Sequence, residues 1–146
     1  MKGSSSLLLL DVNVLLAVAW PNHQHHASAV RVVEPGDDGW ATCAITQLGF
    51  IRLSSNPAVF PAAKSPGEAA SLLAAITADP LHQYLGSLPS PIKTGSPRLF
   101  AGMRGHNQVA DRYLLMLANC NDATFVTFDK RLTAFAPPAT RIKLLA

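Results

Sequence analysis

The feature that most constrains this chain is an apolar run that ends on an acid, in the stretch LLLLDVNVLL at residues 7–16. Four consecutive leucines after a serine cluster predict a short strand buried on both faces, as in a parallel sheet covered by helices. A carboxylate directly after such a strand is costly unless it is hydrogen-bonded, paired or bound to a metal ion. Asp11 is therefore either the N-cap of a following helix or one member of a larger acidic site.

The rest of the chain alternates between strand and helix patterns. Further strands are predicted at 40–46, 84–89, 123–128 and 140–145, a turn at 36–39, and helices at 13–20, 24–34, 45–55, 65–80, 108–120 and 129–135. The helix at 65–80 has the clearest signals, because Ser65, Pro66 and Glu68 form a capped start and Pro80 marks the stop. Residues 86–105, rich in Gly and Pro, predict a long connection with one helical turn at 98–103.

This alternation predicts the α/β class, with a central parallel sheet of about four to five strands between layers of helices. At 146 residues and 49% hydrophobic composition, the chain can bury one sizeable core, so we expect a single domain over residues 1–146. Residues 1–6 are expected to form a flexible N-terminal segment. The sequence has no apolar run long enough to span a bilayer and no signal-peptide pattern, which favours a cytoplasmic protein without a membrane partner.

Three acids are expected to meet at one edge of this sheet. Asp11 and Asp129 each follow a predicted strand directly, and ligands in parallel sheets gather at the carboxyl ends of the strands. Asp111 lies early in the helix at 108–120 and could face the same edge. Three carboxylates in one cleft would raise one another's pKa unless a cation lies between them. Oxygen ligands that leave coordinated waters in place favour Mg²⁺ or Mn²⁺ over zinc.

The segments LLDVNVLLAVAWPNHQHH, GWATCAITQLGFIRLSSNP, HNQVADRYLLMLA and FVTFD together resemble the PIN-domain ribonucleases, in particular the VapC toxins of bacterial toxin–antitoxin pairs. The resemblance covers nearly the whole chain in the right order. It implies a PIN-like three-layer sandwich, and Asp11, Asp111 and Asp129 match three of the acids that hold Mg²⁺ or Mn²⁺ in that family. It also implies an RNA substrate, a VapB-type antitoxin and a homodimer. We expect the apolar surface for a partner to come from the helices at 13–20 and 24–34.

The family's fourth acid, a Glu, is absent, because the chain reads TQLGF with Gln47 at that position. Gln keeps the shape and one carbonyl ligand but removes a full negative charge. Either the site works with three carboxylates, or its activity is reduced, or the change was introduced to keep a toxic enzyme quiet. The surrounding segment resembles a branch of VapC toxins that carries Gln here, which favours a natural Gln47.

Other polar residues near these positions have two interpretations each. Asn13 could donate to a metal-bound water or carboxylate, or it could be a helix N-cap. Thr127 lies two residues before Asp129, on the same side of the strand, and could hydrogen-bond a metal ligand. His23, His25 and His26 are expected to be solvated or packed rather than to bind metal. The net charge of +3 permits a polyanionic partner, and the candidate RNA-binding side chains are Arg52, Arg98, Arg104, Arg112 and Lys130.

Two rival functions remain open. A phosphatase of the haloacid-dehalogenase type also begins with an apolar strand that ends in Asp-x-Asp, but here Asn13 replaces the second Asp and removes the general acid. The second rival is a catalytically weak or inactive PIN domain that binds RNA or an antitoxin, and Gln47 makes this rival credible. A chromogenic phosphate ester would test the first, and a Glu at position 47 would test the second.

Overall fold

The structure is a computed structural model that describes residues 7–33, 39–93, 99–101, 103, 105–136 and 140–146. The N-terminal segment predicted for residues 1–6 lies outside the described residues, and so do most of the turn predicted at 36–39 and part of the helical turn predicted at 98–103. No helix in the described part of the chain is long and apolar enough to cross a membrane.

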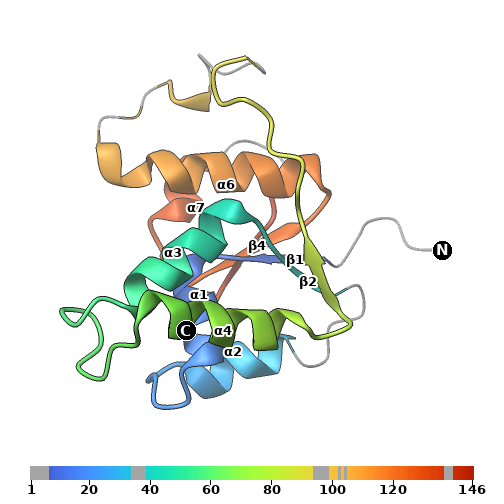
Figure 1. Cartoon of the computed structure of the whole chain (residues 1–146). Coiled ribbons are helices and arrows are strands. Elements are labelled where there is room, and N and C mark those ends of the chain that lie inside the picture. Colours follow the sequence, from blue (N-terminus) through green and yellow to red (C-terminus); the bar gives the residue numbers. More distant parts are fainter. Residues whose placement is uncertain (1–6, 34–38, 94–98, 102, 104, 137–139) are drawn as a thin grey trace.

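A five-stranded, entirely parallel sheet forms the centre of the fold (Figure 1). Its strands are β1 (Leu8–Leu10), β2 (Trp40–Thr42), β3 (His82–Tyr84), β4 (Thr124–Thr127) and β5 (Ile142–Leu144), in the order β3-β2-β1-β4-β5. The leucine-rich strand β1 is therefore central, with β2 on one side and β4 on the other. This arrangement confirms the predicted α/β class and explains why β1 carries apolar residues on both faces.

Helices cover both faces of the sheet and create two separate cores. The described α-helices are α1 (Val12–Ala19), α2 (His26–Val33), α3 (Ala44–Ser54), α4 (Pro66–Thr77), α6 (Val109–Cys120) and α7 (Leu132–Phe135), and a 3₁₀ turn, η1 (His106–Gln108), precedes α6. On one face Leu10 and Val126 pack with α1, α2, α3 and α4. On the other face Leu9 and Phe125 pack with α6 and α7. Alternate residues of β1 and β4 thus enter opposite cores, which fixes the register of the sheet.

The predicted start of α4 is confirmed in detail. The Ser65 hydroxyl accepts a hydrogen bond from the backbone N–H of Glu68 at 3.1 Å, and the Glu68 carboxylate accepts one from the backbone N–H of Ser65 at 2.9 Å. Pro66 takes the first helical position, where a missing N–H has no cost. The helix ends at Thr77, shortly before Pro80.

The third strand is displaced from its predicted position. The sequence pattern favoured residues 84–89, whereas the structure has β3 at His82–Tyr84. As an edge strand, β3 pairs with β2 alone, through the parallel register Trp40↔His82 and Thr42↔Tyr84. Its side chains are half-buried or exposed, so no apolar pattern marked this strand in the sequence.

The partner surface predicted from the first two helices is wrong for α1. That helix is almost wholly buried beneath its neighbours, and Val14, Leu15 and Ala17 have no exposed surface. The most exposed large apolar side chains of the described residues are instead Ile92, at 80%, and Leu48 on α3, at 67%. Small residues in α1 serve packing between helices and the sheet rather than an outer interface.

Candidate active site

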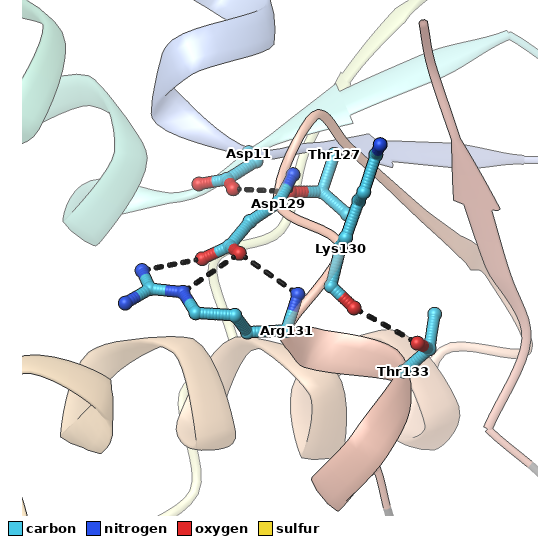
Figure 2. Close-up of polar contacts among 6 residues, drawn as sticks. All are labelled: Asp11, Thr127, Asp129, Lys130, Arg131 and Thr133. Carbon is cyan, nitrogen blue, oxygen red and sulfur yellow. Dashed lines mark hydrogen bonds and ion pairs between the residues drawn. The ribbon is translucent and has the colours of Figure 1, made fainter.

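Asp11 lies directly after the central strand and is almost completely buried, with 7% of its surface exposed. One carboxylate oxygen, Oδ1, accepts a hydrogen bond from the backbone N–H of Val12 at 2.7 Å. The other, Oδ2, accepts one from the Thr127 hydroxyl at 2.7 Å (Figure 2). Burial raises the pKa of Asp11, while the hydrogen bonds from Thr127 and Val12 oppose that rise. Asp11 is thus both the N-cap of α1 and a buried acid, so the two interpretations of its role are compatible.

Thr127 confirms the prediction that its hydroxyl would reach a candidate metal ligand, because that ligand is Asp11. The same hydroxyl accepts a hydrogen bond from the backbone N–H of Asp129 at 3.0 Å. One buried side chain therefore connects the two strand-end acids. Asn13, in contrast, is exposed inside α1, so its interpretation as the helix N-cap is wrong.

Asp129 lies two residues beyond β4, beside Asp11, and its carboxylate is bound by Arg131 (Figure 2). The backbone N–H and the Nε of Arg131 both donate to Oδ1 at 3.0 Å, and Nη2 donates to Oδ2 at 2.9 Å. The Arg131 guanidinium holds the pKa of Asp129 below its usual value, chiefly through these hydrogen bonds. Asp129 is therefore an anion in the neutral pH range.

Asp111 occupies the first turn of α6, the helix that covers the opposite face of the sheet from α1. Burial raises its pKa to about 6, and the negative charges of Asp11 and Asp129 contribute to that rise, while Arg131 lowers it. An electrostatic effect of this kind requires that the three carboxylates lie near one another. Asp111 thus lies close enough to Asp11 and Asp129 for their charges to act on it, while the role of the three acids as a joint metal site stays a prediction.

The three acids are neighbours, but they are not arranged as a ready-made metal cage. Within the described ranges, no group of three or more His, Cys, Asp or Glu side chains has the geometry to hold a metal ion. Their chemistry nevertheless fits a hard divalent cation, because all three offer carboxylate oxygens, and the pKa values of Asp11 and Asp111 are raised chiefly by burial and further by neighbouring negative charge. Coordination would require the side chains to close on the ion, and Asp129 would have to leave at least part of its contact with Arg131.

Gln47 lies in the first turn of α3 at the same edge of the sheet, but its side chain contacts the neighbouring strand. Its amide Nε2 donates to the Thr42 hydroxyl at 3.1 Å, and that hydroxyl is 2.7 Å from Nε2 of His82. A chain of hydrogen bonds thus runs from α3 across the end of β2 to β3. The Gln47 carbonyl oxygen is the one side-chain atom left to offer a cation, and its role as a ligand stays a prediction.

The cationic side chains predicted for RNA binding have different outcomes. Arg98 and Arg104 lie outside the described residues. Arg52 borders a hollow of about 280 Å³ whose lining also includes Ile45, Leu48 and Ala110, between α3 and α6. Lys130 is exposed and lies next to Asp129 in the turn after β4 (Figure 2). Arg112 follows Asp111 on α6 and is half-buried. Lys130 and Arg112 are therefore the sequence neighbours of the candidate site acids Asp129 and Asp111.

The histidines of the first helical hairpin have packing and turn-forming contacts, as predicted. His23 Nδ1 accepts from the backbone N–H of His25 at 3.0 Å, and His26 Nδ1 lies 2.7 Å from the carbonyl oxygen of Ala17. The His25 ring stacks on Phe128 with centroids 4.7 Å apart. His23 and His26 thus use their Nδ1 atoms in local contacts with the backbone, and His25 packs through the face of its ring.

Two features of this region were missed from the sequence. The first is Arg131, whose signal was the spacing Asp-x-Arg immediately after a buried strand. The second is an apolar cavity of about 400 Å³ between α3, α6 and the segment at 88–91, lined by residues that include Ile45, Phe100 and Tyr113. The Tyr113 hydroxyl donates to the Pro89 carbonyl oxygen and ties that segment to α6.

The fold and the acids together define a class of protein: a parallel α/β domain with an acidic site at the carboxyl ends of its central strands. A family model described as "PIN domain" matches residues 8–136, so the chain belongs to the PIN-domain family. Curated relatives specify the branch. Ribonuclease VapC38 of Mycobacterium tuberculosis is 37% identical over 142 residues, covering 95% of this chain and 98% of that protein. Ribonuclease VapC39 of the same species is 40% identical over 125 residues, covering 85% of this chain and 89% of that protein.

Solved structures support the fold independently of sequence. The chain superimposes with a TM-score of 0.67 on a chain of VapBC2 from Rickettsia felis bound to a promoter DNA fragment, at 12% identity, covering 96% of this chain and 99% of that one. A chain of DNA-bound VapBC from Salmonella typhimurium gives a TM-score of 0.63 at 13% identity, covering 94% and 97%. At such low identity these similarities establish the architecture alone.

Proposed function

We propose that this chain is a VapC-type endoribonuclease that hydrolyses RNA phosphodiester bonds and acts as the toxin of a toxin–antitoxin pair. Relatives of nearly equal length that are named Ribonuclease VapC support the RNA substrate. The observation that carries the proposal is the grouping of Asp11, Asp111 and Asp129 at the carboxyl ends of β1 and β4, where the Thr127 hydroxyl links Asp11 to the backbone of Asp129 (Figure 2). The pKa of Asp111, which burial and then the charges of Asp11 and Asp129 raise to about 6, supports this grouping. Such a cluster of acids is unfavourable in a structural role and well suited to a divalent cation.

The proposed cofactor is Mg²⁺ or Mn²⁺, held by Asp11, Asp111 and Asp129. When bound, the ion would neutralise charge at the scissile phosphate and lower the pKa of a water molecule. The chain's own residues hold the acids for this task. The Thr127 hydroxyl donates to the carboxylate of Asp11 and accepts from the backbone N–H of Asp129, so both strand-end acids keep a fixed position relative to each other. Burial keeps water away from Asp11, which strengthens its interaction with any cation.

The proposed partners are a VapB-type antitoxin and a second copy of the chain. The similar solved structures are structures of VapBC, which supports the antitoxin. The homodimer remains a prediction. A cytoplasmic location also remains a prediction, which rests on the fact that RNA and the proposed antitoxin are both made in that compartment. Exposed Leu48 on α3 and exposed Val109 on α6, close to the proposed site, are apolar enough to be covered by either partner.

The proposal is tested by cleavage of a structured RNA across a series of Mn²⁺ concentrations. We expect no cleavage in EDTA, and a loss of at least about a hundredfold in Asp11→Asn, because removing a ligand charge costs at least as much as disturbing an outer-shell partner. Asp122→Asn is the matched control, since Asp122 is an exposed acid that precedes β4, at the amino ends of the strands, and is paired with Arg141. Cleavage that persists in EDTA or in Asp11→Asn would contradict the metal-dependent activity.

A second candidate function, a weakly active or inactive PIN domain, is favoured by Gln47. A Glu at this position would add one negative charge to the edge of the site, and two unit charges about 4 Å apart interact by roughly 4 kcal/mol at an effective dielectric near 20. We therefore expect Gln47→Glu to bind metal more tightly and cut RNA faster, and Mn²⁺ to rescue the unaltered chain better than Mg²⁺. The Thr42 hydroxyl would then have to donate to position 47 instead of accepting from it. Equal rates and equal metal dependence for both chains would remove Gln47 from the proposed site.

The phosphatase alternative has less support. Its second acid would stand at position 13, and the structure has an exposed Asn13 within α1. An amide cannot act as the general acid of that chemistry. Hydrolysis of a chromogenic phosphate monoester by the purified chain, at a rate above its RNA cleavage, would reverse this preference.

A further inference from the structure

One side chain, Arg131, uses most of the hydrogen-bonding capacity of Asp129. A carboxylate offers about four lone-pair sites on its two oxygens. The backbone N–H and Nε of Arg131 occupy both sites of Oδ1, and Nη2 occupies one site of Oδ2. The fork of two parallel side-chain bonds is the geometry in which guanidinium binds a carboxylate most strongly. The Oδ2 atom of Asp129 therefore keeps about one free lone pair for any other ligand.

The side chain of Arg131 contacts Asp129 from the solvent side. The guanidinium is mostly in solvent, with 71% of the side chain exposed, whereas the Asp129 side chain is 22% exposed. Figure 2 shows the arginine side chain folded back from the turn after β4 onto Asp129. The cation is thus next to the acids but is not locked in place by packing.

We propose that Arg131 is an internal cation that competes with a divalent metal ion for Asp129. This inference rests on the proposed function, since it concerns the same acids. An ion that binds both carboxylate oxygens of Asp129 displaces the guanidinium, because Arg131 already occupies both sites of Oδ1 and one site of Oδ2. An ion at the remaining site of Oδ2 is repelled by the positive charge of the same guanidinium. The displacement is easy, since the side chain is exposed and regains rotational freedom in solvent. Arg131 thereby sets the metal concentration at which the site fills.

Isothermal titration calorimetry with Mn²⁺ on the full chain tests this proposal. Exposed ion pairs are weak, so we expect Arg131→Ala to bind Mn²⁺ only about fivefold more tightly than the unaltered chain. Arg131→Lys keeps the charge but loses the fork, and it should give an intermediate affinity. Arg141→Ala is the matched control, because it removes an arginine from another exposed ion pair, with Asp122, at the amino ends of the strands. Its Mn²⁺ affinity should equal that of the unaltered chain.

The alternative is that the Asp129–Arg131 contact only shapes the turn between β4 and α7. In that case Arg131→Ala would lower the unfolding temperature in EDTA and would bind Mn²⁺ equally or more weakly, which overturns the proposal. Tighter binding in the Arg141→Ala control as well would also overturn it. Should Arg131→Ala fold poorly, the Lys variant decides, because an affinity equal to that of the unaltered chain contradicts competition.

The outcomes separate this inference from the proposed function. Equal binding by the unaltered chain and Arg131→Ala leaves the metal site standing and removes the competition. No Mn²⁺ binding by either chain removes both. Binding by Arg131→Ala alone supports the competition in its strongest form.

Discussion

Replacing Asp111 by Asn should stabilise the metal-free protein at neutral pH and destabilise the metal-loaded one. The pKa of Asp111 is raised from 3.8 to about 6, chiefly by burial and then by the charges of Asp11 and Asp129. Between these two values the folded protein binds more protons than the unfolded chain, so the free energy of unfolding falls as pH rises. Above about pH 6 the whole penalty is present, and the uncharged amide introduced by Asp111→Asn does not incur it.

The size of this effect follows from the same pKa values. Each unit corresponds to about 1.36 kcal/mol, so the rise from 3.8 to about 6 sets an upper bound of about 3 kcal/mol. Asp111 is only partly buried, and solvent screening reduces the expected gain for Asp111→Asn to about 1 to 2 kcal/mol at pH 7.5. Near pH 4 the two chains should differ little. With Mn²⁺ at about a hundred times its dissociation constant, a chain that binds gains about 2.7 kcal/mol over one that does not.

Urea denaturation at pH 4.5 and 7.5, in EDTA and in excess Mn²⁺, measures all four free energies of unfolding. We expect Asp111→Asn to be the more stable chain only in EDTA at pH 7.5, and the order to reverse in Mn²⁺. Asp122→Asn is the control, because it removes an exposed carboxylate outside the acidic cluster. The reasoning is refuted if Asp111→Asn gains no stability at pH 7.5 in EDTA, or if the control gains as much.

Three further predictions concern the same region. Thr127→Val should lower the free energy of unfolding by about 1 to 3 kcal/mol, because the buried carboxyl group of Asp11 loses a 2.7 Å hydrogen bond that Val cannot replace. A change below about 0.5 kcal/mol in urea denaturation would argue against this. Gly49→Ala should lower the free energy of unfolding by about 1 to 3 kcal/mol, since the new Cβ would lie 2.8 Å from a side-chain methyl group of Val12 in α1. At Gly67 a new Cβ meets nothing within 4 Å, so Gly67→Ala should be neutral or stabilising, and equal melting temperatures for the two variants would contradict the packing argument. Mn²⁺ binding should release about half a proton from Asp111 at pH 6 and much less at pH 7.5, because the pKa of this acid is about 6. Calorimetry in buffers of different ionisation enthalpy measures this release, and a release independent of pH would count against Asp111 as a ligand.

The sheet and two of its acids were predictable because their signals are local. The leucines before Asp11 and the apolar run before Asp129 each mark a buried strand and its end, and parallel strands end at a common edge. The two-residue period of a strand placed Thr127 on the side of Asp129, at the end of the strand where its hydroxyl meets Asp11. Each of these inferences uses residues within a few positions of one another and one general rule about sheets.

The features that were missed leave no apolar pattern in the sequence, because they depend on backbone pairing at a sheet edge or on the geometry of polar side chains at the ends of strands. The edge strand β3 is held by backbone pairing to β2, with half-buried or exposed side chains that leave no apolar signature. The partner of Gln47 is Thr42, five residues away, in a contact set by how α3 begins after β2. Arg131 binds Asp129 rather than Asp11 or Asp111, and for an exposed side chain the partner depends on the folded geometry of the turn after β4.

The three candidate acids solve one electrostatic problem in three different ways. Asp11 is buried and is stabilised by hydrogen bonds from Thr127 and Val12, whereas Asp129 is neutralised by the guanidinium of Arg131. For Asp111 burial and then the charges of Asp11 and Asp129 outweigh the attraction of Arg131, and its raised pKa means that it carries a proton more readily than an ordinary aspartate. A divalent cation would replace the proton and the guanidinium at once, because it offers two positive charges to the same oxygens. The metal-free site is therefore best understood as one whose charge is balanced by weak, replaceable partners, and the strength of metal binding should depend on how easily each of them leaves.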